Sequence, residues 1–197
     1  QKNLFSHVLG QIDDNNIGIS GIEKFFDKNL KKEELSDSSL SLTLDSNLQH
    51  LIRQELIKAR TSFGNIGSAA VLMKVDNGEV LSLISLPDYD LNKRISIKED
   101  FYTNKITLGV YELGSVFKTF TIAAGLENKV IKPNTTFKNL ENSLTCDKYT
   151  ISEHDKLPKN LNVEQILIRS SNIGAVRIAQ KIGIEKYKDF LNKLGLL

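Results

Sequence analysis

Two residues at the start of one expected helix carry the clearest chemical pattern in the chain. Ser115 and Lys118 form a Ser-x-x-Lys sequence where a run of helical apolar spacing begins. Positions i and i+3 lie on one helical face, about 5 to 6 Å apart at Cβ, so the lysine amine can reach the serine hydroxyl. A neutral lysine can activate a serine nucleophile if desolvation or nearby cations lower its pKa from about 10.4. The spacing therefore indicates acyl transfer through serine.

A second polar cluster supports this interpretation. Taken alone, Ser-x-x-Lys has little specificity, because a solvated serine at a helix start beside an exposed lysine gives the same pattern. Further along the chain, Ser170, Ser171 and Asn172 lie at a break between two expected helices, where a polar loop can project into a cleft. A second hydroxyl in this cluster can relay a proton to a leaving group, and Asn172 can hold a substrate amide and the lysine together. An ordinary helix cap explains the same residues, so it is the joint occurrence of both clusters that favours catalysis.

A β-hairpin is the clearest element before these clusters. Two β-rich runs, 67–75 and 79–86, are joined by Asp-Asn-Gly at 76–78, which is the strongest short-range hairpin signal in a sequence. Apolar periodicity and turn residues predict the other elements of this half. They are a short strand at 40–44, a helix from Asp45 or Ser46 to about Thr61, and a long loop at 88–112.

Helices dominate the half that carries the two polar clusters. A mostly buried helix is expected to begin at Ser115 and to end before Pro133, and it would position Lys118. Residues 134–160 are polar and are expected to form a loop, after which Asn162 can cap a short helix. The remaining expected helices span 163–168, 172 to about 181, and 184–194, with Gly183 and Gly195 as their stops.

Composition excludes several classes of function. The 197 residues carry 26 Lys and Arg against 24 Asp and Glu, a net charge of +2, so there is no electrostatic footprint of nucleic-acid binding. The single cysteine, Cys146, allows no internal disulfide and no thiolate metal site. His7, His50 and His154 have no metal-ligand spacing, so surface or capping roles are expected, and we predict neither a metal nor a cofactor. No apolar run of about 18 residues is present to span a membrane.

The two clusters and their flanks resemble the penicillin-binding proteins, specifically the monofunctional class B transpeptidases of the cell-division type. Residues 111–118, Tyr-Glu-Leu-Gly-Ser-Val-Phe-Lys, are similar to the family's nucleophile motif, and Ser170-Ser171-Asn172 is similar to its second motif. The resemblance implies that Ser115 is the nucleophile, that Lys118 is its activator, and that Ser170 and Asn172 serve catalysis and substrate binding. Further similar stretches are 6–10, 18–23, 26–27, 42–45, 48–49, 78–81 and 85–87.

The resemblance also implies the fold and its division. It implies an α+β fold, the N-terminal half of a β-lactamase-like transpeptidase domain, built from an antiparallel hairpin and a helical subdomain after a short linker segment. A charged and polar run near residue 36 predicts a boundary between 1–36, the end of a non-catalytic pedestal or dimerisation segment, and 37–197, a partial transpeptidase domain. The family's third motif, Lys-Thr-Gly or Lys-Ser-Gly, is absent, and the family places it beyond Leu197.

The activity implied by the resemblance is the D,D-transpeptidation that cross-links peptidoglycan. Its substrates are peptidoglycan stem peptides, and β-lactams would acylate the same serine, with no cofactor. The resemblance implies a parent protein anchored at the periplasmic face of a bacterial inner membrane by an upstream helix, with possible partners among division proteins. Without the third motif we expect this chain to be inactive or weakly active and to self-associate through its hairpin.

Two other functions fit the same motifs. A serine β-lactamase-like hydrolase shares them but hydrolyses its acyl-enzyme. Ser171 argues mildly against that alternative, because class A β-lactamases have Asp at the middle position. A non-catalytic β-lactam sensor or scaffold module is the other alternative. The lifetime of the acyl-enzyme separates the first two functions, and covalent labelling separates both from a scaffold.

Overall fold

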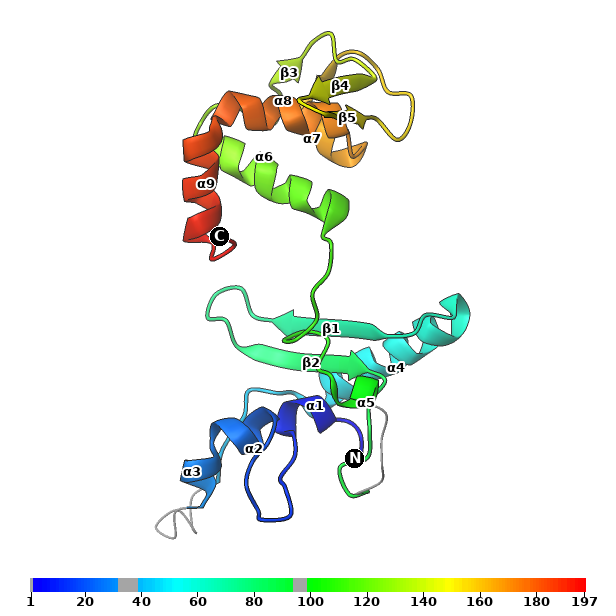
Figure 1. Ribbon diagram of the computed structural model, residues 1–197, viewed down its shortest axis with the longest axis vertical. Coiled ribbons are helices and arrows are strands. Elements are labelled where there is room, and N and C mark those ends of the chain that lie inside the picture. The colour runs from blue at the N-terminus through cyan, green and yellow to red at the C-terminus, as the bar shows by residue number, and fades with distance from the viewer. Residues whose placement is uncertain (1, 32–38, 94–98) are drawn as a thin grey trace. The chain divides into compact units, whose positions relative to one another are not determined.

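The computed structural model describes residues 2–31, 39–93 and 99–197 (Figure 1). The chain divides into two compact units, Gln1–Tyr111 and Glu112–Leu197, and each is described by itself. The boundary expected near residue 36 lies outside the described residues, so the division into 1–36 and 37–197 stays a prediction.

The first unit contains the expected hairpin. Strands β1 and β2 pair in antiparallel register from Ser68 opposite Leu86 to Met73 opposite Val80, which confirms the prediction from the Asp-Asn-Gly turn. The predicted helix after Asp45 is also confirmed, because the Asp45 carboxylate accepts hydrogen bonds from the backbone amides at the helix start. The elements are α1 Ser6–Leu9, α2 Gly21–Phe25, α3 Asp27–Leu30, α4 Ser46–Phe63, β1 Ser68–Met73, β2 Val80–Leu86 and α5 Glu99–Tyr102.

Two of the secondary-structure predictions for this unit are wrong. Residues 40–44 form no strand, because they make only scattered contacts to β2 instead of a ladder. The Thr43 hydroxyl donates to the Val80 carbonyl at 2.7 Å, and the Asp45 amide donates to the Leu81 carbonyl at 2.9 Å. The loop expected at 88–112 contains the short helix α5, which is too brief to show helical periodicity in the sequence.

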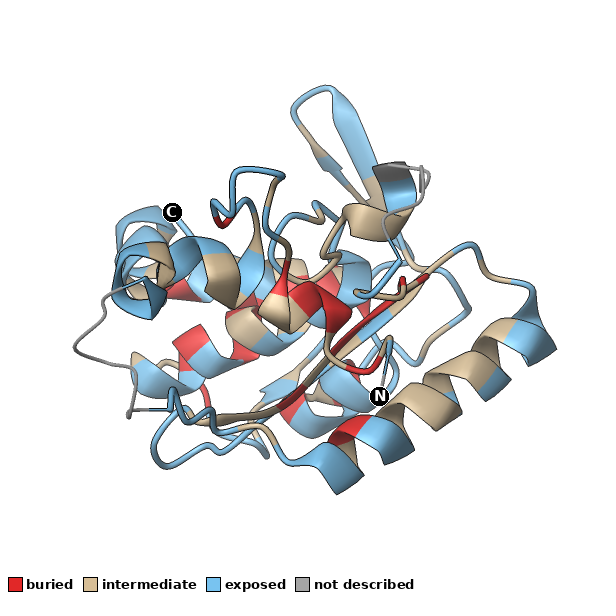
Figure 2. Cartoon of the chain, turned by 90° about the horizontal axis from the view of Figure 1, so that it is seen from below, coloured by how far each residue is buried: buried red, intermediate tan, exposed pale blue. Residues whose placement is uncertain are grey.

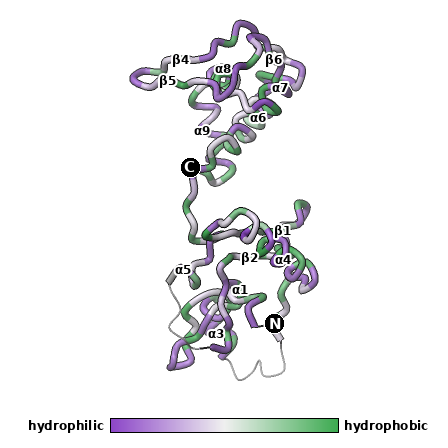
Figure 3. Tube along the Cα trace, turned by 90° about the vertical axis from the view of Figure 1, so that its right-hand side faces the viewer, coloured by the Kyte–Doolittle hydropathy of each residue, from purple (hydrophilic) through white to green (hydrophobic). Residues whose placement is uncertain are grey.

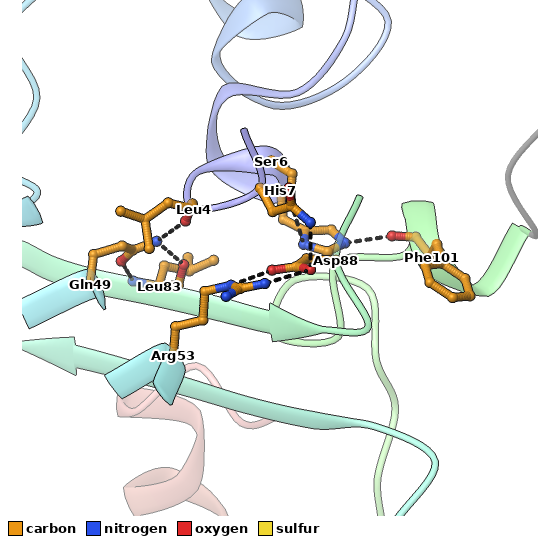
Figure 4. Close-up of polar contacts among 9 residues, drawn as sticks. Leu4, Ser6, His7, Gln49, Arg53, Leu83, Asp88 and Phe101 are labelled. Atoms are coloured by element: carbon orange, nitrogen blue, oxygen red, sulfur yellow. Dashed lines mark hydrogen bonds and ion pairs between the residues drawn. The ribbon is translucent and has the colours of Figure 1, made fainter. Parts of the chain in front are cut away.

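A buried glutamine holds three segments of the first unit together (Figure 4). Gln49 is α4's one buried residue, and the rest of that helix is intermediate or exposed (Figure 2). Its amide nitrogen donates to the carbonyls of Leu4 and Leu83 at 2.9 and 2.8 Å. Its carbonyl oxygen accepts from the Ser82 hydroxyl at 2.8 Å and the Leu83 amide at 2.9 Å. Every hydrogen-bonding position of the side chain is therefore used, as burial of an amide requires.

His7 differs from the expected surface or capping role, because it is buried (Figure 4). Its Nε2 lies 2.7 Å from the carbonyl oxygen of Phe101 and must carry the hydrogen, since a carbonyl only accepts. The ring also packs edge-on against Tyr89, with 5.3 Å between centroids. Burial lowers the pKa of His7, against the smaller opposing effect of the Phe101 hydrogen bond. Near it, the Arg53 guanidinium binds Asp88, with 2.6 Å between Nε and Oδ2.

The second unit is a helical cluster with short strands at one side (Figure 1). Its core consists of aliphatic side chains from the helices and their connections, including Ile122, Ile166 and Ile178. Apolar residues are frequent in α6 (Lys118–Glu127), which contributes to this core, whereas the turn between β4 (Ser143–Cys146) and β5 (Tyr149–Ser152) is hydrophilic (Figure 3). The elements are the 3₁₀ helix η2 Gly114–Phe117, α6 Lys118–Glu127, β3 Thr136–Phe137, β4 Ser143–Cys146, β5 Tyr149–Ser152, β6 Leu161–Asn162, α7 Val163–Ile168, α8 Asn172–Ile182 and α9 Ile184–Lys193.

The helices of this unit are predicted well and its strands are not. The predicted α7 is confirmed, with Asn162 and Gln165 forming a reciprocal capping box. The helix expected from Ser115 begins as a 3₁₀ turn, and its α-helical part ends at Glu127. The loop expected at 134–160 is wrong, because it holds the β4–β5 hairpin and strand β3, which pairs with β6 just after it. These strands are two to four residues long, too short for alternation of polar and apolar residues to identify them.

Candidate active site

Ser115 and Lys118 meet where a 3₁₀ turn passes into an α-helix. Gly114 has φ 54°, a left-handed conformation that suits glycine, and it begins the turn that carries Ser115. Lys118 is the first residue of α6. Its Nζ lies 3.1 Å from the Ser115 Oγ, so the contact predicted from the i, i+3 spacing is present.

Ser170 reaches the same lysine from the end of α7. Its amide donates to the Leu167 carbonyl at 3.0 Å, and the Ser171 amide donates to the Ile166 carbonyl at 2.9 Å. These two bonds make a Schellman ending, in which glycine usually takes the left-handed position. Here Ser170 occupies it with φ 54°, at a cost of roughly 1–2 kcal/mol for a residue with a Cβ. A serine in that position places a hydroxyl where glycine would offer none.

The Lys118 ammonium is surrounded by oxygen acceptors. Besides the Ser115 Oγ, Nζ donates to the Ser170 carbonyl at 2.6 Å and to the Ser170 Oγ at 2.9 Å. Removal from water lowers the pKa of Lys118, and the negative charge of Glu153 opposes that shift. A lowered pKa raises the neutral fraction of the amine at a given pH, and the neutral amine can accept a proton from a hydroxyl.

Asn172 is held by the β4–β5 hairpin. Its Nδ2 donates to the Ser152 carbonyl at 2.7 Å, and its backbone amide donates to a Glu153 carboxylate oxygen at 2.7 Å. Within the described part of the chain, the structure shows no hydrogen bond between Asn172 and Lys118. The expected site residues therefore divide into three that meet, Ser115, Lys118 and Ser170, and one that lies beside them on α8.

Glu153 is the residue of this site that the sequence did not reveal. It follows β5, and its carboxylate accepts from the Ser171 hydroxyl at 2.6 Å and from the amides of Asn172 and Ile173 at 2.7 and 3.0 Å. Carboxylates are favoured at helix N-termini, and Glu153 lies at the start of α8. No spacing rule links it to that helix, because the two are separated by an irregular segment and the whole of α7.

Metal ligation has no support in the residues that the structure describes. Among them, no group of three or more His, Cys, Asp or Glu side chains lies close enough to hold an ion. Cys146 is a free, partly buried thiol in β4. The polar groups that meet around Lys118 and Ser171 are hydroxyls, an amine and a carboxylate.

A comparison with known families assigns the chain. Residues 68–196 match the model of the penicillin binding protein transpeptidase domain. The chain belongs to this family. Among curated relatives, it is 31% identical over 192 residues to a probable peptidoglycan D,D-transpeptidase FtsI of Caulobacter vibrioides, covering 97% of this chain and 32% of the relative. It is 28% identical to stage V sporulation protein D of Bacillus subtilis, covering 98% of this chain and 34% of that protein. The chain thus spans about a third of these transpeptidase-family relatives.

Two solved structures are similar to the chain in fold. The apo structure of the TP domain from Burkholderia pseudomallei penicillin-binding protein 3 has 28% identity and a TM-score of 0.66, over 78% of this chain and 42% of that one. A putative peptidoglycan glycosyltransferase from Atopobium parvulum has a TM-score of 0.83 over 98% of this chain and 48% of that one. At 24% identity, the second likeness shows the fold alone. The predicted α+β transpeptidase fold is confirmed.

Proposed function

We propose that this chain carries the nucleophile of a peptidoglycan D,D-transpeptidase, with Ser115 as the attacking residue. The observation that carries the proposal is the meeting of Ser115, Lys118 and Ser170 around one amine nitrogen. Together these residues supply the groups that serine acyl transfer needs. Ser115 is the nucleophile, Lys118 is a base of lowered pKa, and Ser170 is a second hydroxyl.

The reaction begins with a proton transfer inside the site. Neutral Lys118 uses two N–H groups toward Ser170, and its lone pair accepts the Ser115 hydroxyl proton. The Ser115 oxygen attacks the carbonyl carbon of the penultimate D-Ala in a stem peptide. When the C–N bond breaks, the amine of the terminal D-Ala takes the proton back from Lys118 through the Ser170 hydroxyl. An ester at Ser115 remains.

The second half of the reaction forms the cross-link. An amine of a neighbouring stem peptide attacks the ester carbonyl and gives up a proton to Lys118. The C–O bond to Ser115 breaks, the proton returns to the serine oxygen, and a new amide joins the two strands. A β-lactam follows only the first half, because its ring amide opens on Ser115 and the leaving amine stays tethered. We therefore expect a long-lived acyl-enzyme.

The wider setting of the activity is part of the proposal. The parent protein would act at the periplasmic face of a bacterial inner membrane, beside other cell-division proteins. Within the described residues, no helix has the length and apolarity to cross a bilayer.

Since these 197 residues contain no Lys-Thr-Gly or Lys-Ser-Gly, we expect the chain by itself to acylate slowly. The family resemblance implies that this motif completes the oxyanion hole, and loss of one oxyanion donor lowers rates by roughly 10²- to 10³-fold.

Covalent labelling tests the proposal. A fluorescent penicillin should label the protein that carries this chain, and mass spectrometry should place the adduct on Ser115. Ser115→Ala should abolish labelling. Ser143→Ala is the matched control, because Ser143 is an exposed serine of β4 in the same unit and should label as the wild type does.

Three outcomes would contradict the assignment. Wild-type labelling of Ser115→Ala would show that another residue is the nucleophile. Deacylation within seconds would favour the β-lactamase-like hydrolase. Absence of labelling in the protein that also carries a third motif would favour a scaffold module.

A further inference from the structure

The turn that places Ser170 beside Lys118 is held by the carboxylate of Glu153. Glu153 accepts three hydrogen bonds, from the Ser171 hydroxyl and from the amides of Asn172 and Ile173. Ser171 is fully buried, and its hydroxyl oxygen also accepts from the Gly174 amide at 2.9 Å. Bonds to an ionised acceptor are shorter and stronger than neutral ones, so this contact constrains the chain firmly.

The constraint reaches the lysine through a single peptide plane. The Ser170 carbonyl and the Ser171 amide belong to that plane, which is rigid because the peptide bond is planar. The carbonyl accepts from Lys118 Nζ at 2.6 Å, while the Ser171 amide donates to the Ile166 carbonyl. Ser170 is in the left-handed region, which it would leave readily if its neighbours were released. Glu153 accepts from the Ser171 hydroxyl and from the next amide, so these bonds restrict rotation of the plane.

Glu153 also acts on Lys118 through its charge. The negative charge of Glu153 favours the ammonium form of Lys118, against the larger effect of burial, which lowers the Lys118 pKa. The neighbouring Tyr187 of α9 is engaged elsewhere, because its hydroxyl lies 2.6 Å from that of Thr121. Glu153 itself touches neither Lys118 nor Ser115, so any effect on the reaction is indirect.

From these contacts we infer that Glu153 is the positioning residue of this site, holding the Ser170–Ser171 turn so that the Ser170 carbonyl and hydroxyl stay on Lys118. The inference rests on the proposed function for its kinetic consequence. The residue makes two separable contributions. Its length fixes the contacts that hold the Ser170–Ser171 turn, and its charge partly opposes the lowering of the Lys118 pKa by burial.

Two substitutions separate these contributions. Glu153→Gln removes the charge and turns an N–H toward one of the three donors, so at least one bond is lost. Glu153→Asp keeps the charge but is one methylene shorter, so the carboxylate no longer reaches every donor. Glu185→Gln is the matched control, because Glu185 is an exposed carboxylate at the N-terminus of α9 in the same unit.

The first readout is the pH profile of penicillin acylation in the protein that carries this chain. Acylation needs neutral Lys118, so its acid limb follows the Lys118 pKa. Glu153→Gln should lower the plateau rate at least about tenfold and move the limb to lower pH, because the charge favouring the ammonium is gone. Glu153→Asp should lower the plateau and leave the limb in place. Glu185→Gln should change neither.

The second readout needs no activity. Lysine labelled with ¹³C at Cε reports the Lys118 titration by NMR, with the resonance assigned through Lys118→Arg. The Lys118 midpoint should fall in Glu153→Gln and stay in Glu153→Asp. Wild-type plateaus in both variants, or an unmoved Lys118 midpoint in Glu153→Gln, would overturn the inference. If the wild type fails to label, the proposed function is wrong, while the NMR titration still decides the role of Glu153.

Discussion

Lys118 is the residue on which the proposed chemistry depends, because its one amine nitrogen contacts both Ser115 and Ser170. Its position was predictable from the i, i+3 spacing, but its surroundings were not. The Ser170 carbonyl comes from a distant part of the chain, and a carbonyl can only accept, so it orients the amine's hydrogens. With the Ser170 carbonyl and hydroxyl on Nζ, the third polar contact of this nitrogen is with the Ser115 hydroxyl.

Lys118→Arg tests whether proton transfer or charge is needed. The guanidinium keeps a positive charge but cannot lose its proton, so acylation should fall by more than tenfold. The measurement is the rate of fluorescent penicillin labelling. Lys188→Arg, an exposed lysine of α9, should label as the wild type does. A rate within about threefold of the wild type in Lys118→Arg would rule out lysine as the base.

The pH dependence of acylation has a definite sign. Burial lowers the pKa of Lys118, so the neutral amine forms at lower pH than for a lysine in water. The acylation rate should therefore rise with pH up to a plateau, with its midpoint below the ordinary lysine pKa of about 10.4. Stopped-flow acylation with a chromogenic cephalosporin between pH 5 and 10 measures it. A rate that is flat with pH, or that falls across this range, would contradict the assignment of Lys118.

At the scale of elements, α7 matters because Ser170 lies in the turn that ends it. The helix is six residues long, too short to be stable by propensity alone, so its capping box and its buried side chains must hold it. Val163 and Ile166 are its buried residues and belong to the core of the second unit. The order of α7 and the geometry at Lys118 are therefore coupled.

Asn162→Ala should weaken that coupling. The Asn162 side chain accepts from the Gln165 amide at 2.7 Å, and losing such a cap costs about 0.5–2 kcal/mol. Hydrogen exchange at the α7 amides should speed up accordingly, and acylation should slow. Asn134→Ala in a surface connection serves as the control and should alter neither. Unchanged exchange in Asn162→Ala would show that packing alone holds α7.

At the scale of the whole molecule, the hairpin of the first unit is the feature that needs a neighbour. Among the described residues, β1 pairs with β2 only, so the outer edge of β1 has no strand partner. Val71 and Met73 on β1 are 51% and 55% exposed. A bare edge with apolar side chains is a template for pairing with another chain.

The 197-residue chain, produced by itself, should therefore self-associate. Light scattering should show a mass that rises with concentration, and Val71→Lys should reduce the association because a charge at a strand edge opposes pairing. Tyr149→Lys, which changes an exposed residue of β5 in the other unit, is the control. A monomer at all concentrations would contradict this expectation.

The sequence by itself determined what depends on neighbours a few residues apart. Three features involve residues only a few positions apart, so sequence spacing predicts them. They are the Ser115–Lys118 contact, the hairpin turn at 76–78 and the Asn162 cap. The family resemblance added the expectation that Ser170 takes part in catalysis and substrate binding.

Only the tertiary structure decided how Ser170 and Glu153 join the site. Ser170 meets Lys118 because a left-handed residue ends α7 in a place where glycine is usual, and a sequence pattern does not reveal such a conformation. Glu153 reaches α8 because β4 and β5 fold into a hairpin whose strands, four residues each, are too short for alternation to identify them. Contacts between residues far apart in the chain depend on packing, which sets distances that sequence spacing does not contain.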